Sequence, residues 1–541
     1  MTTKKCCGLI VGGAVAILAS ACGSSSSNVA AVSVPEEGAA VLEGGVTAEV
    51  EGEEGSSLLS LGRLRGIFRF SPASGPVGSS VTLTGRALQT AESFVFAGSL
   101  FNTNDDVVVT NFTRNSDTEV VVTVPAGAVT GPIQAIDTND RVETSVASFE
   151  VTSAGPGTGT TILNPFPTPG SIFGTSLSFL NNGLLVGAPG VAAGSGNAYV
   201  LNSNGNLAFS LNNPDPDAEG GDGFATALAA EGNLIVIGAP FDDTDGADAG
   251  IVYLFNRSTG NLVATLNDPT PEPQGNFGSS VAISGGLIAI GTPGQDADTA
   301  VNAAGEVHLF STSGNLLNTI ANPVPGVGDV FGFALGLSGD LLAVGAPGNE
   351  FASVNGAGSV YIYNIDPFPL TTPLLVETIN NPGPIAGDSF GGSLAFKGDR
   401  LAVGTPGADD TATGTSGSGV VYLYTVNSAF CQSAVFCNAS QTAVFESPNP
   451  RQLAAFGSAV AISPDESRVL VGEPLGSNGL GTAYLFNASF AGTLIDTFTN
   501  PGNAGDSFGI SVALSDTEAL VGAPLSRLES ISSGRAYLFA Q

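Results

Sequence analysis

The sequence is poor in residues that carry positive charge. Lysine and arginine together supply 15 of its 541 residues against 48 aspartates and glutamates, it has one histidine and no tryptophan, and its formal net charge is −33. A surface with this balance repels phosphate backbones and anionic lipid headgroups. We therefore expect no nucleic-acid partner, and a partner that binds through charge should carry cations or a basic surface.

Cysteine is also scarce, and three of the five cysteines lie in an N-terminal segment with the features of an export signal. A lysine pair precedes an apolar run at 8–18, which is shorter than the roughly 20 residues needed to span a bilayer. The small residues 19–21 then precede Cys22. This stretch resembles a bacterial lipoprotein signal with its lipobox. The resemblance implies that residues 1–21 are a signal peptide and that Cys22 carries the lipid; ordinary signal cleavage is the alternative.

The same resemblance implies an exported protein that touches the membrane through a lipid anchor only. Gly23 stands where lipoproteins retained at the inner membrane commonly carry Asp, so the expected location is the outer membrane or surface of the bacterial cell envelope. Residues 22–65 are rich in small residues and glutamate and show no period. This composition predicts a flexible tether, with unrecognised short strands as the alternative.

Cys431 and Cys437 are the two remaining cysteines. Two cysteines close together in a polar segment of an exported chain favour a local disulfide. A metal pair is the weaker alternative, because no second cysteine pair or nearby histidine completes a site. The insertion around them, at roughly 427–451, is the candidate contact surface, since a disulfide that rigidifies an exposed loop lowers the ordering cost of binding.

Residues 66–152 contain short runs of alternating apolar and polar residues separated by turn residues. This spacing predicts a small β-sandwich. The stretches Ser71-Pro72-Ala73-Ser74-Gly75-Pro76 and Val124-Pro125-Ala126-Gly127 resemble the IPT/TIG domain, an immunoglobulin-like module. The resemblance implies a spacer or interaction module of cell-surface proteins and carries no catalytic residues.

From residue 160 onward the sequence repeats one phrase, which in its clearest form at 276–294 opens with Phe-Gly and closes with Gly-x-Pro. A period of about 50 residues indicates an array of one supersecondary unit. Seven copies occur, with phenylalanine at 173, 224, 277, 331, 390, 456 and 508 and the closing glycine at 187, 238, 291, 345, 404, 472 and 522.

Each copy contains four candidate strands. One follows Phe-Gly, as at 280–284, and a more continuously apolar one precedes Gly-x-Pro, as at 287–290; the third and fourth resemble 251–255 and 317–321. Four antiparallel strands per unit predict a propeller blade, with the second strand buried on both faces. The glycine after it is expected to let the chain turn away.

The two ends of the repeat region complement each other. The seventh copy ends after its third strand, and residues 160–167 match the missing fourth strand. We expect this N-terminal strand to complete the last blade and close the ring, which removes exposed strand edges. The sequence therefore predicts an all-β chain, in which a small immunoglobulin-like β-sandwich precedes a seven-bladed β-propeller at 160–541.

The repeat region resembles the FG-GAP family, whose members form the β-propeller of integrin α-subunits and occur in bacterial surface proteins. Integrin-type blades often carry a calcium loop, Asp-x-Asp-x-Asp-Gly-x-x-Asp, between their first two strands. Here that connection is short, as at 230–233, 284–286 and 397–400. The family's calcium sites are therefore not expected in this chain.

Two patterns inside the repeat invite functional readings. His308 stands where the other copies have tyrosine, so we expect a structural aromatic position rather than a catalytic one. Several copies carry Asp or Asn shortly before the phenylalanine, at Asp222, Asn276, Asp329, Asp388 and Asp506. Such residues usually accept hydrogen bonds from nearby backbone amides in a turn; cation binding along one rim is the alternative.

The loop 242–248 is the best candidate for a metal site. Asp242, Asp243, Asp245 and Asp248 alternate around a glycine, and such carboxylates can surround Ca²⁺. The loop follows Gly-Ala-Pro, on the wrong side for the family's site, and lacks the terminal Glu of an EF-hand. A solvated acidic loop is the alternative, so calcium is the one cofactor considered.

The favoured function is a non-enzymatic surface lipoprotein, a binding or adhesion module whose propeller loops meet a protein or glycan partner. The sequence shows neither a nucleophile paired with a base nor a phosphate-binding loop. Two alternatives stay open: an extracytoplasmic hydrolase with a carboxylate site at the propeller mouth, and a structural component of the envelope.

Overall fold

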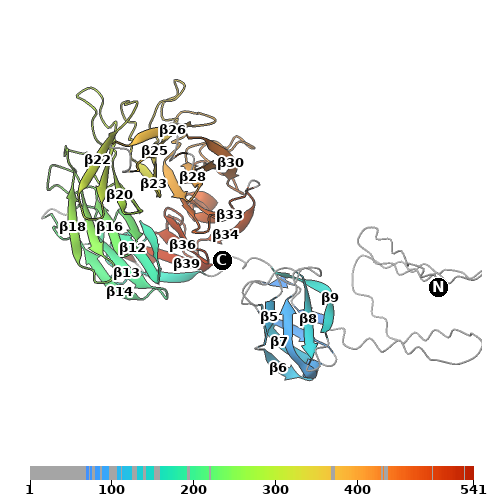
Figure 1. Cartoon of the computed structure of the whole chain (residues 1–541). Coiled ribbons are helices and arrows are strands. Elements are labelled where there is room, and N and C mark those ends of the chain that lie inside the picture. The colour runs from blue at the N-terminus through green and yellow to red at the C-terminus, as the bar shows by residue number, and fades with distance from the viewer. Residues whose placement is uncertain are drawn as a thin grey trace, which may run out of the picture. The chain divides into compact units, whose positions relative to one another are not determined.

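The structure is a computed structural model (Figure 1). It describes residues 69–71, 74–75, 80–85, 88–96, 107–110, 112–124, 131–137, 142–151 and 159–541, the last range without 192–194, 218–220, 367–371, 428–430, 432–436, 490–491 and 529–530. The predicted signal peptide, the lipidation site at Cys22 and the tether lie outside the described residues. None of the helices in the described ranges is long and apolar enough to cross a membrane.

Residues 69–151 form two β-sheets, with one 3₁₀ turn, η1 (Leu88–Thr90). The strands are antiparallel except for the parallel pair β2–β9. Side chains alternate between the faces, so that Val81, Leu83, Phe94, Phe96 and Phe149 share one core. The sheets are, in order, β1 (Arg69–Ser71), β3 (Ser80–Thr84), β7 (Glu119–Thr123) and β6 (Thr113–Ser116); and β2 (Ser74–Gly75), β9 (Val142–Val151), β8 (Gly131–Asp137), β4 (Ala91–Phe96) and β5 (Val107–Val109).

The remaining residues form seven four-stranded antiparallel sheets, the blades, which are numbered here along the chain. The first four are β11 (Leu177–Leu180), β12 (Gly183–Ala188), β13 (Asn197–Asn202) and β14 (Leu207–Asn212); β15 (Ala227–Glu231), β16 (Leu234–Ala239), β17 (Ile251–Asn256) and β18 (Leu262–Asn267); β19 (Ser280–Ser284), β20 (Leu287–Thr292), β21 (Glu306–Ser311) and β22 (Leu316–Ala321); and β23 (Ala334–Ser338), β24 (Leu341–Ala346), β25 (Ser359–Asn364) and β26 (Leu374–Asn380).

The last three blades follow the same order. They are β27 (Ser393–Lys397), β28 (Arg400–Thr405), β29 (Val420–Val426) and β30 (Ala439–Glu446); β31 (Ala459–Ile462), β32 (Arg468–Glu473), β33 (Thr482–Asn487) and β34 (Leu494–Thr499); and β35 (Val512–Leu514), β36 (Glu518–Ala523), β39 (Arg535–Ala540) and β10 (Thr160–Leu163). A short helix, α2 (Gly476–Gly479), and a hairpin of β37 (Arg527–Leu528) and β38 (Ile531–Ser532) lie in loops.

The blades close into a ring, as Figure 1 shows. First strands of successive blades contact one another in order, and β11 of the first blade contacts β35 of the last. Strand β10 pairs antiparallel with β39, from Thr160 opposite Leu538 to Leu163 opposite Arg535. The prediction that the N-terminal strand completes the last blade is confirmed, as is the all-β fold with a sandwich before a seven-bladed propeller.

The two glycine positions of the repeat are explained by contact between blades. A Cβ atom on Gly291 would lie 2.1 Å from the carbonyl oxygen of Gly332, and one on Gly345 would lie 2.2 Å from that of Gly391. The glycine of Gly-x-Pro in one blade therefore touches the glycine of Phe-Gly in the next. Our expectation that it lets the chain turn away is wrong, because Gly291 and Gly345 lie inside strands β20 and β24.

Antiparallel strands place the connections of every blade at two ends of the ring. The connections between second and third strands, and those from a fourth strand into the next blade, form one end, which we call the loop face. In the third blade these are 293–305 and 268–279. The other connections form the turn face. The loop face therefore holds the longer connections of most blades, and the turn face holds most of the short ones.

Candidate functional site

Each loop that enters a blade begins with a polar residue that fixes a turn. The oxygen Asn322 Oδ1 accepts a hydrogen bond from the amide of Val324 at 3.0 Å, and Asn381 Oδ1 accepts one from the amide of Gly383 at 3.0 Å. The third blade has Asp268 at this position, where Oδ1 accepts from the amide of Thr270 at 2.8 Å. The other blades use Asn164, Asn213, Ser447 and Asn500.

The repeated aspartates before the phenylalanines are buried acceptors in the same loops. Asp329 Oδ2 accepts from Asn322 Nδ2 at 2.9 Å and from the amide of Gly326 at 2.7 Å, and Asp388 Oδ2 accepts from Asn381 Nδ2 at 2.7 Å. Asp222 and Asp506 also accept from backbone amides. The prediction that these residues accept hydrogen bonds in a turn is confirmed for the four aspartates, whereas Asn276 Nδ2 donates to the carbonyls of Pro240 and Asp248. Burial raises the pKa of Asp222 and Asp388.

The predicted calcium loop keeps most of its carboxylates in contact with the chain around it. Asp242 is buried and its Oδ1 accepts from the amide of Thr244 at 3.0 Å; Asp243 Oδ1 accepts from the amide of Asp248 at 2.7 Å. Asp245 Oδ2 accepts from Asn267 Nδ2 at 3.2 Å. Burial raises the pKa of Asp242. These contacts are those of an ordered turn, and calcium binding by the loop stays a sequence-based prediction.

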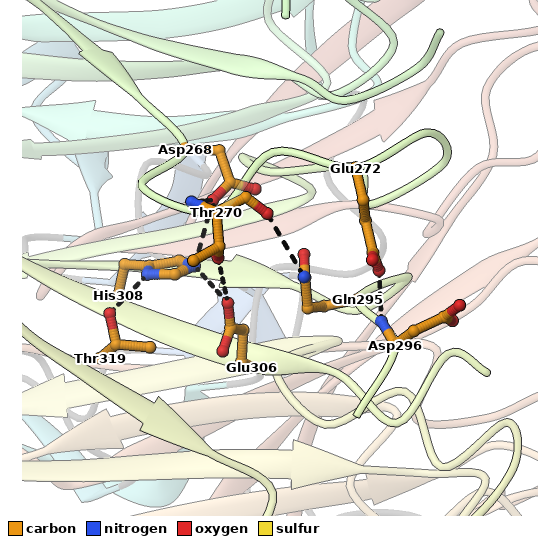
Figure 2. A network of polar contacts seen from close by, with 8 residues as sticks. All are labelled: Asp268, Thr270, Glu272, Gln295, Asp296, Glu306, His308 and Thr319. Atoms are coloured by element: carbon orange, nitrogen blue, oxygen red, sulfur yellow. Dashed lines mark hydrogen bonds and ion pairs between the residues drawn. The ribbon is translucent and has the colours of Figure 1, made fainter. Parts of the chain in front are cut away.

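The structure instead gathers three potential metal ligands in the third blade. Asp268, Glu306 and His308 place a donor atom each within 4.8 Å of one another, the one such group among the residues that the structure describes (Figure 2). His308 Nε2 lies 3.3 Å from Glu306 Oε1 and 3.7 Å from Asp268 Oδ1. The histidine is fully buried, Asp268 is 5% exposed, and the side chain of Glu306 is 14% exposed.

Neighbouring residues fix the three side chains. His308 Nδ1 is 3.0 Å from Thr319 Oγ1 on the adjacent strand β22, and the ring packs against Phe277 with centroids 5.5 Å apart. The Thr270 hydroxyl donates to Glu306 Oε1 at 2.8 Å. The blade thus holds the imidazole by its far nitrogen and directs Nε2 toward the carboxylates (Figure 2).

The environment acts differently on the two carboxyl groups. Burial raises the pKa of Asp268, and the amide of Thr270 and the histidine counteract only part of that effect. Burial also disfavours ionised Glu306, but the imidazole of His308, whose Nε2 lies 3.3 Å from Oε1, outweighs it, so the pKa of Glu306 is lowered. Of the two carboxyl groups beside the imidazole, Glu306 is therefore the one whose ionised form is favoured.

The expected structural role of His308 is correct, but it is incomplete. His308 packs on Phe277 as Tyr361 packs on Phe331, where the centroids are 5.7 Å apart. The sequence did contain a signal for the rest: the copy with histidine in place of tyrosine also has Asp268 in place of asparagine. Asp268 and His308 both differ from the usual residues of the repeat and both belong to the third copy, and this coincidence distinguishes that copy from the others.

The predicted disulfide between Cys431 and Cys437 is confirmed. Both cysteines are buried, and the amide of Cys437 donates to the carbonyl of Val376 on β26 of the fourth blade at 2.8 Å. They lie in the turn from β29 to β30, on the turn face. The expectation of a disulfide in an exposed contact loop is therefore wrong for the two cysteines, which pack between two blades.

A cavity of about 1170 Å³ runs along the ring axis and is lined by the first strands of all seven blades. Most of the lining residues are apolar, with Leu228, Ile283 and Leu394 as examples, but polar groups supply at least half of the exposed lining. The acidic residues of its lining, Asp516 and Glu518, both come from the seventh blade, at the turn face. The lining does not bring carboxylates of several blades together.

Comparison with protein-family models matches the FG-GAP repeat to five segments of the chain, residues 215–255, 263–310, 324–363, 382–424 and 499–539. The ring is a β-propeller with FG-GAP repeats in five of its seven blades. Its second, third, fourth, fifth and seventh blades carry the matched segments, and the first and sixth have the same four strands. The Asp268, Glu306 and His308 cluster lies within the second matched segment.

Two further comparisons add no detail. A similar solved structure is the crystal structure of the Myceliophteria thermophila Cps50 (Swd1) β-propeller domain, at 13% identity and a TM-score of 0.45, with 70% of this chain and 99% of that chain covered. The assignment of the FG-GAP propeller rests on its sheets and repeats, not on this likeness. No curated protein matches the sequence.

Proposed function

We propose that this chain is a non-enzymatic, lipid-anchored protein of the bacterial cell surface whose FG-GAP propeller binds a partner protein through its loop face. The observation that supports this most is where the ring exposes large apolar side chains. Eleven of them lie in loop-face connections, namely Phe166, Phe241, Val324, Val327, Phe333, Ile385, Leu453, Leu475, Leu480, Ile510 and Leu525.

The turn face differs in this respect. Among the described residues of the ring, the other exposed large apolar side chains lie on the fourth strands of the blades, and none lies in a turn-face connection. Val327 is 69% exposed and Leu453 is 65% exposed. Exposed apolar side chains gathered on one surface and interleaved with polar loops are typical of protein-binding sites.

The charge of the loop face indicates what the partner carries. Its connections contain many acidic residues, of which Asp243, Asp245 and Asp296 are exposed, and two cationic ones, Arg451 and Arg527. A partner surface with basic residues around an apolar centre would complement it. Aliphatic side chains outnumber the three phenylalanines among the exposed apolar residues, so we favour a protein over a glycan, for which stacking aromatic residues are better suited.

In this proposal the N-terminal regions hold the propeller at the cell surface. The lipid at Cys22 anchors the chain, residues 22–65 act as a tether, and the IPT/TIG-like sandwich is a spacer between tether and ring. The axial cavity offers little support for a hydrolase, because the two carboxylates of its lining, Asp516 and Glu518, belong to one blade.

A binding assay with two matched triple variants tests the loop face. The full chain, the loop-face variant Val327→Ser, Phe333→Ser, Leu453→Ser, and the outer-strand variant Leu207→Ser, Leu262→Ser, Leu494→Ser are titrated against a panel of immobilised basic and acidic extracellular proteins and glycans. We expect binding to basic proteins that weakens at least tenfold in the loop-face variant only. Equal binding by both variants, or binding to glycans alone, would contradict the proposal.

The anchor is tested separately. Cells that express the full chain are fed radiolabelled palmitate, and the wild type is compared with Cys22→Ser. We expect label on the wild type alone and release of the variant from the membrane fraction. An unlabelled wild type outside the membrane fraction would contradict the lipid anchor and favour ordinary signal cleavage.

A further inference from the structure

His308 Nε2 is a buried nitrogen atom without a hydrogen-bond partner among the described residues. The other ring nitrogen is held by Thr319 Oγ1 at 3.0 Å. If Nδ1 carries the proton and donates to Thr319, Nε2 presents a lone pair to the oxygens of two carboxyl groups. That arrangement is unfavourable unless a positive species lies between the three atoms.

The distances distinguish a proton from a metal ion. A charge-assisted hydrogen bond from an imidazolium to a carboxylate spans about 2.7–2.9 Å. In tetrahedral zinc sites, bond lengths of about 2.0–2.2 Å separate neighbouring donor atoms by about 3.3–3.5 Å. The separations of 3.3 Å and 3.7 Å from Nε2 to Glu306 and Asp268 are closer to the spacing of ligands around a shared ion.

We propose that the third blade binds one divalent transition-metal ion, with Zn²⁺ as the representative, through His308 Nε2 and one oxygen each of Asp268 and Glu306. Imidazole nitrogen and carboxylate oxygen are ordinary zinc ligands. Thr319, which contacts His308 Nδ1, and Thr270, which donates to Glu306, orient two of these ligands through hydrogen bonds (Figure 2). The site is separate from the acidic loop at 242–248.

Other polar atoms of the same blade support this assignment. Asp268 Oδ2, Thr292 Oγ1 and Gln295 Oε1 are buried and have no hydrogen-bond partner among the described residues. Thr292 pairs with Glu306 in the sheet, and Gln295 Nε2 donates to the carbonyl of Thr270 at 3.3 Å. A native fold usually satisfies such atoms. Thr405 Oγ1 of the fifth blade is also unpartnered at the position of Thr292, so the support comes from Asp268 Oδ2 and Gln295 Oε1, which lie beside the three potential ligands.

The fourth blade shows what the same position looks like without a ligand set. There Asn322 and Ser359 stand where the third blade has Asp268 and Glu306, and Tyr361 stands in place of His308. One carboxylate, Asp329, receives hydrogen bonds from its neighbours. An ion in the third blade would tie the entering loop 268–279 to β21, a connection that the fourth blade makes by hydrogen bonds.

The test is a titration of the full chain, purified without a histidine tag and stripped of metal, with Zn²⁺ by calorimetry and with Co²⁺ by visible absorption. The variants His308→Tyr and Asp268→Asn place in the third blade the residues that other blades carry, so they are designed to fold. We expect one ion per chain in the wild type and affinity at least tenfold weaker in each variant. The variant Thr319→Val should weaken binding by about tenfold through loss of ligand orientation.

Controls separate this site from the acidic surface. The variant Tyr361→His puts a histidine in the fourth blade, where Asn322 and Ser359 stand in place of the two carboxylates. It should add no second ion. The variant Asp243→Asn, Asp245→Asn removes two carboxylates of the 242–248 loop and should leave zinc affinity unchanged. If His308→Tyr fails to fold by circular dichroism, Glu306→Gln takes its place.

Two results would overturn the proposal. One is zinc affinity that is equal in the wild type and the His308→Tyr or Glu306→Gln variant, which would place the ion on surface carboxylates. The other is the absence of stoichiometric binding at micromolar zinc, which would leave His308 with only its structural role against Phe277.

Discussion

The third and fourth blades share four strands, a buried phenylalanine and the close contact between glycines, yet their interiors near the loop face differ. In the fourth blade one aspartate, Asp329, receives several N–H donors and lies near Tyr361, whose pKa burial and this carboxylate raise to about 12. In the third blade two carboxyl groups surround the imidazole of His308. The comparison teaches that one copy of a repeat can exchange a satisfied hydrogen-bond network for a set of ligands without changing its fold.

The largest expected effect concerns what the two blades share. Phe277 and Phe331 are both fully buried against the aromatic residue of the third strand. Replacing either with alanine should lower the free energy of unfolding by about 3–5 kcal/mol, since both remove a large buried side chain. Urea unfolding of the two variants measures this. A much smaller loss for Phe277→Ala would mean that the third blade is not packed like the fourth.

The next effect extends the comparison to the fifth blade, whose β29–β30 turn is closed by a disulfide and hydrogen-bonds to Val376 of the fourth blade. Replacing Cys431 and Cys437 with serine should cost about 2 kcal/mol, because the disulfide closes a short loop and its sulfurs are buried. Urea unfolding with and without a reductant measures the loss. Zinc binding in the third blade should not change, and a parallel loss of zinc affinity would show that the effect is global.

A smaller effect contrasts the two carboxylates directly. The variant Asp329→Ala leaves Asn322 and the amide of Gly326 without their acceptor and should cost about 2 kcal/mol. The variant Asp268→Asn, in metal-free protein, should cost less than about 1 kcal/mol, because the amide oxygen still accepts from Thr270. Thermal unfolding in EDTA compares them, and equal losses would remove the distinction between the blades.

The smallest effect is a dependence on pH in the fifth blade, where Asp388 occupies the position of Asp329. Burial raises the pKa of Asp388, so the folded state binds the proton more tightly than the unfolded state. Its contribution to stability is present below the unfolded pKa of about 3.9 and is lost as pH rises through the folded value. Asp388→Asn should therefore reduce the stabilisation that the wild type gains from this carboxyl group as pH falls from 7 to about 4, measured as the change in melting temperature. If the variant keeps the same change of melting temperature with pH as the wild type, the pH dependence belongs to other buried carboxyl groups.

The fold could be predicted from the sequence because the same four-strand pattern occurs in seven copies. The spacing of Phe-Gly and Gly-x-Pro defines four strands per copy, and a missing last strand together with residues 160–167 defines the closure. The role of the glycines could not be predicted, because Gly291 is required by the backbone of Gly332 in the next blade. Contacts between blades leave no local pattern.

The site was harder to predict than the fold. Strands β19 and β20 lie between Asp268 and the pair Glu306 and His308 in the sequence. Only strand pairing and the entering loop bring the three residues together. The acidic loop at 242–248 looked stronger because its carboxylates are adjacent in sequence. In the folded chain, adjacent carboxylates such as Asp242 and Asp243 accept hydrogen bonds from different amides.

The most direct test of the third blade uses the fact that His308 is the only histidine in the chain. The full chain, without a histidine tag and labelled with nitrogen-15 at histidine, gives imidazole signals that belong to His308 alone. On addition of one equivalent of Zn²⁺ to metal-free protein, we predict that the Nε2 signal moves to the position of a metal-bound nitrogen while Nδ1 stays protonated, and that Asp268→Asn weakens this change. Two protonated nitrogens that do not respond to zinc would contradict the account.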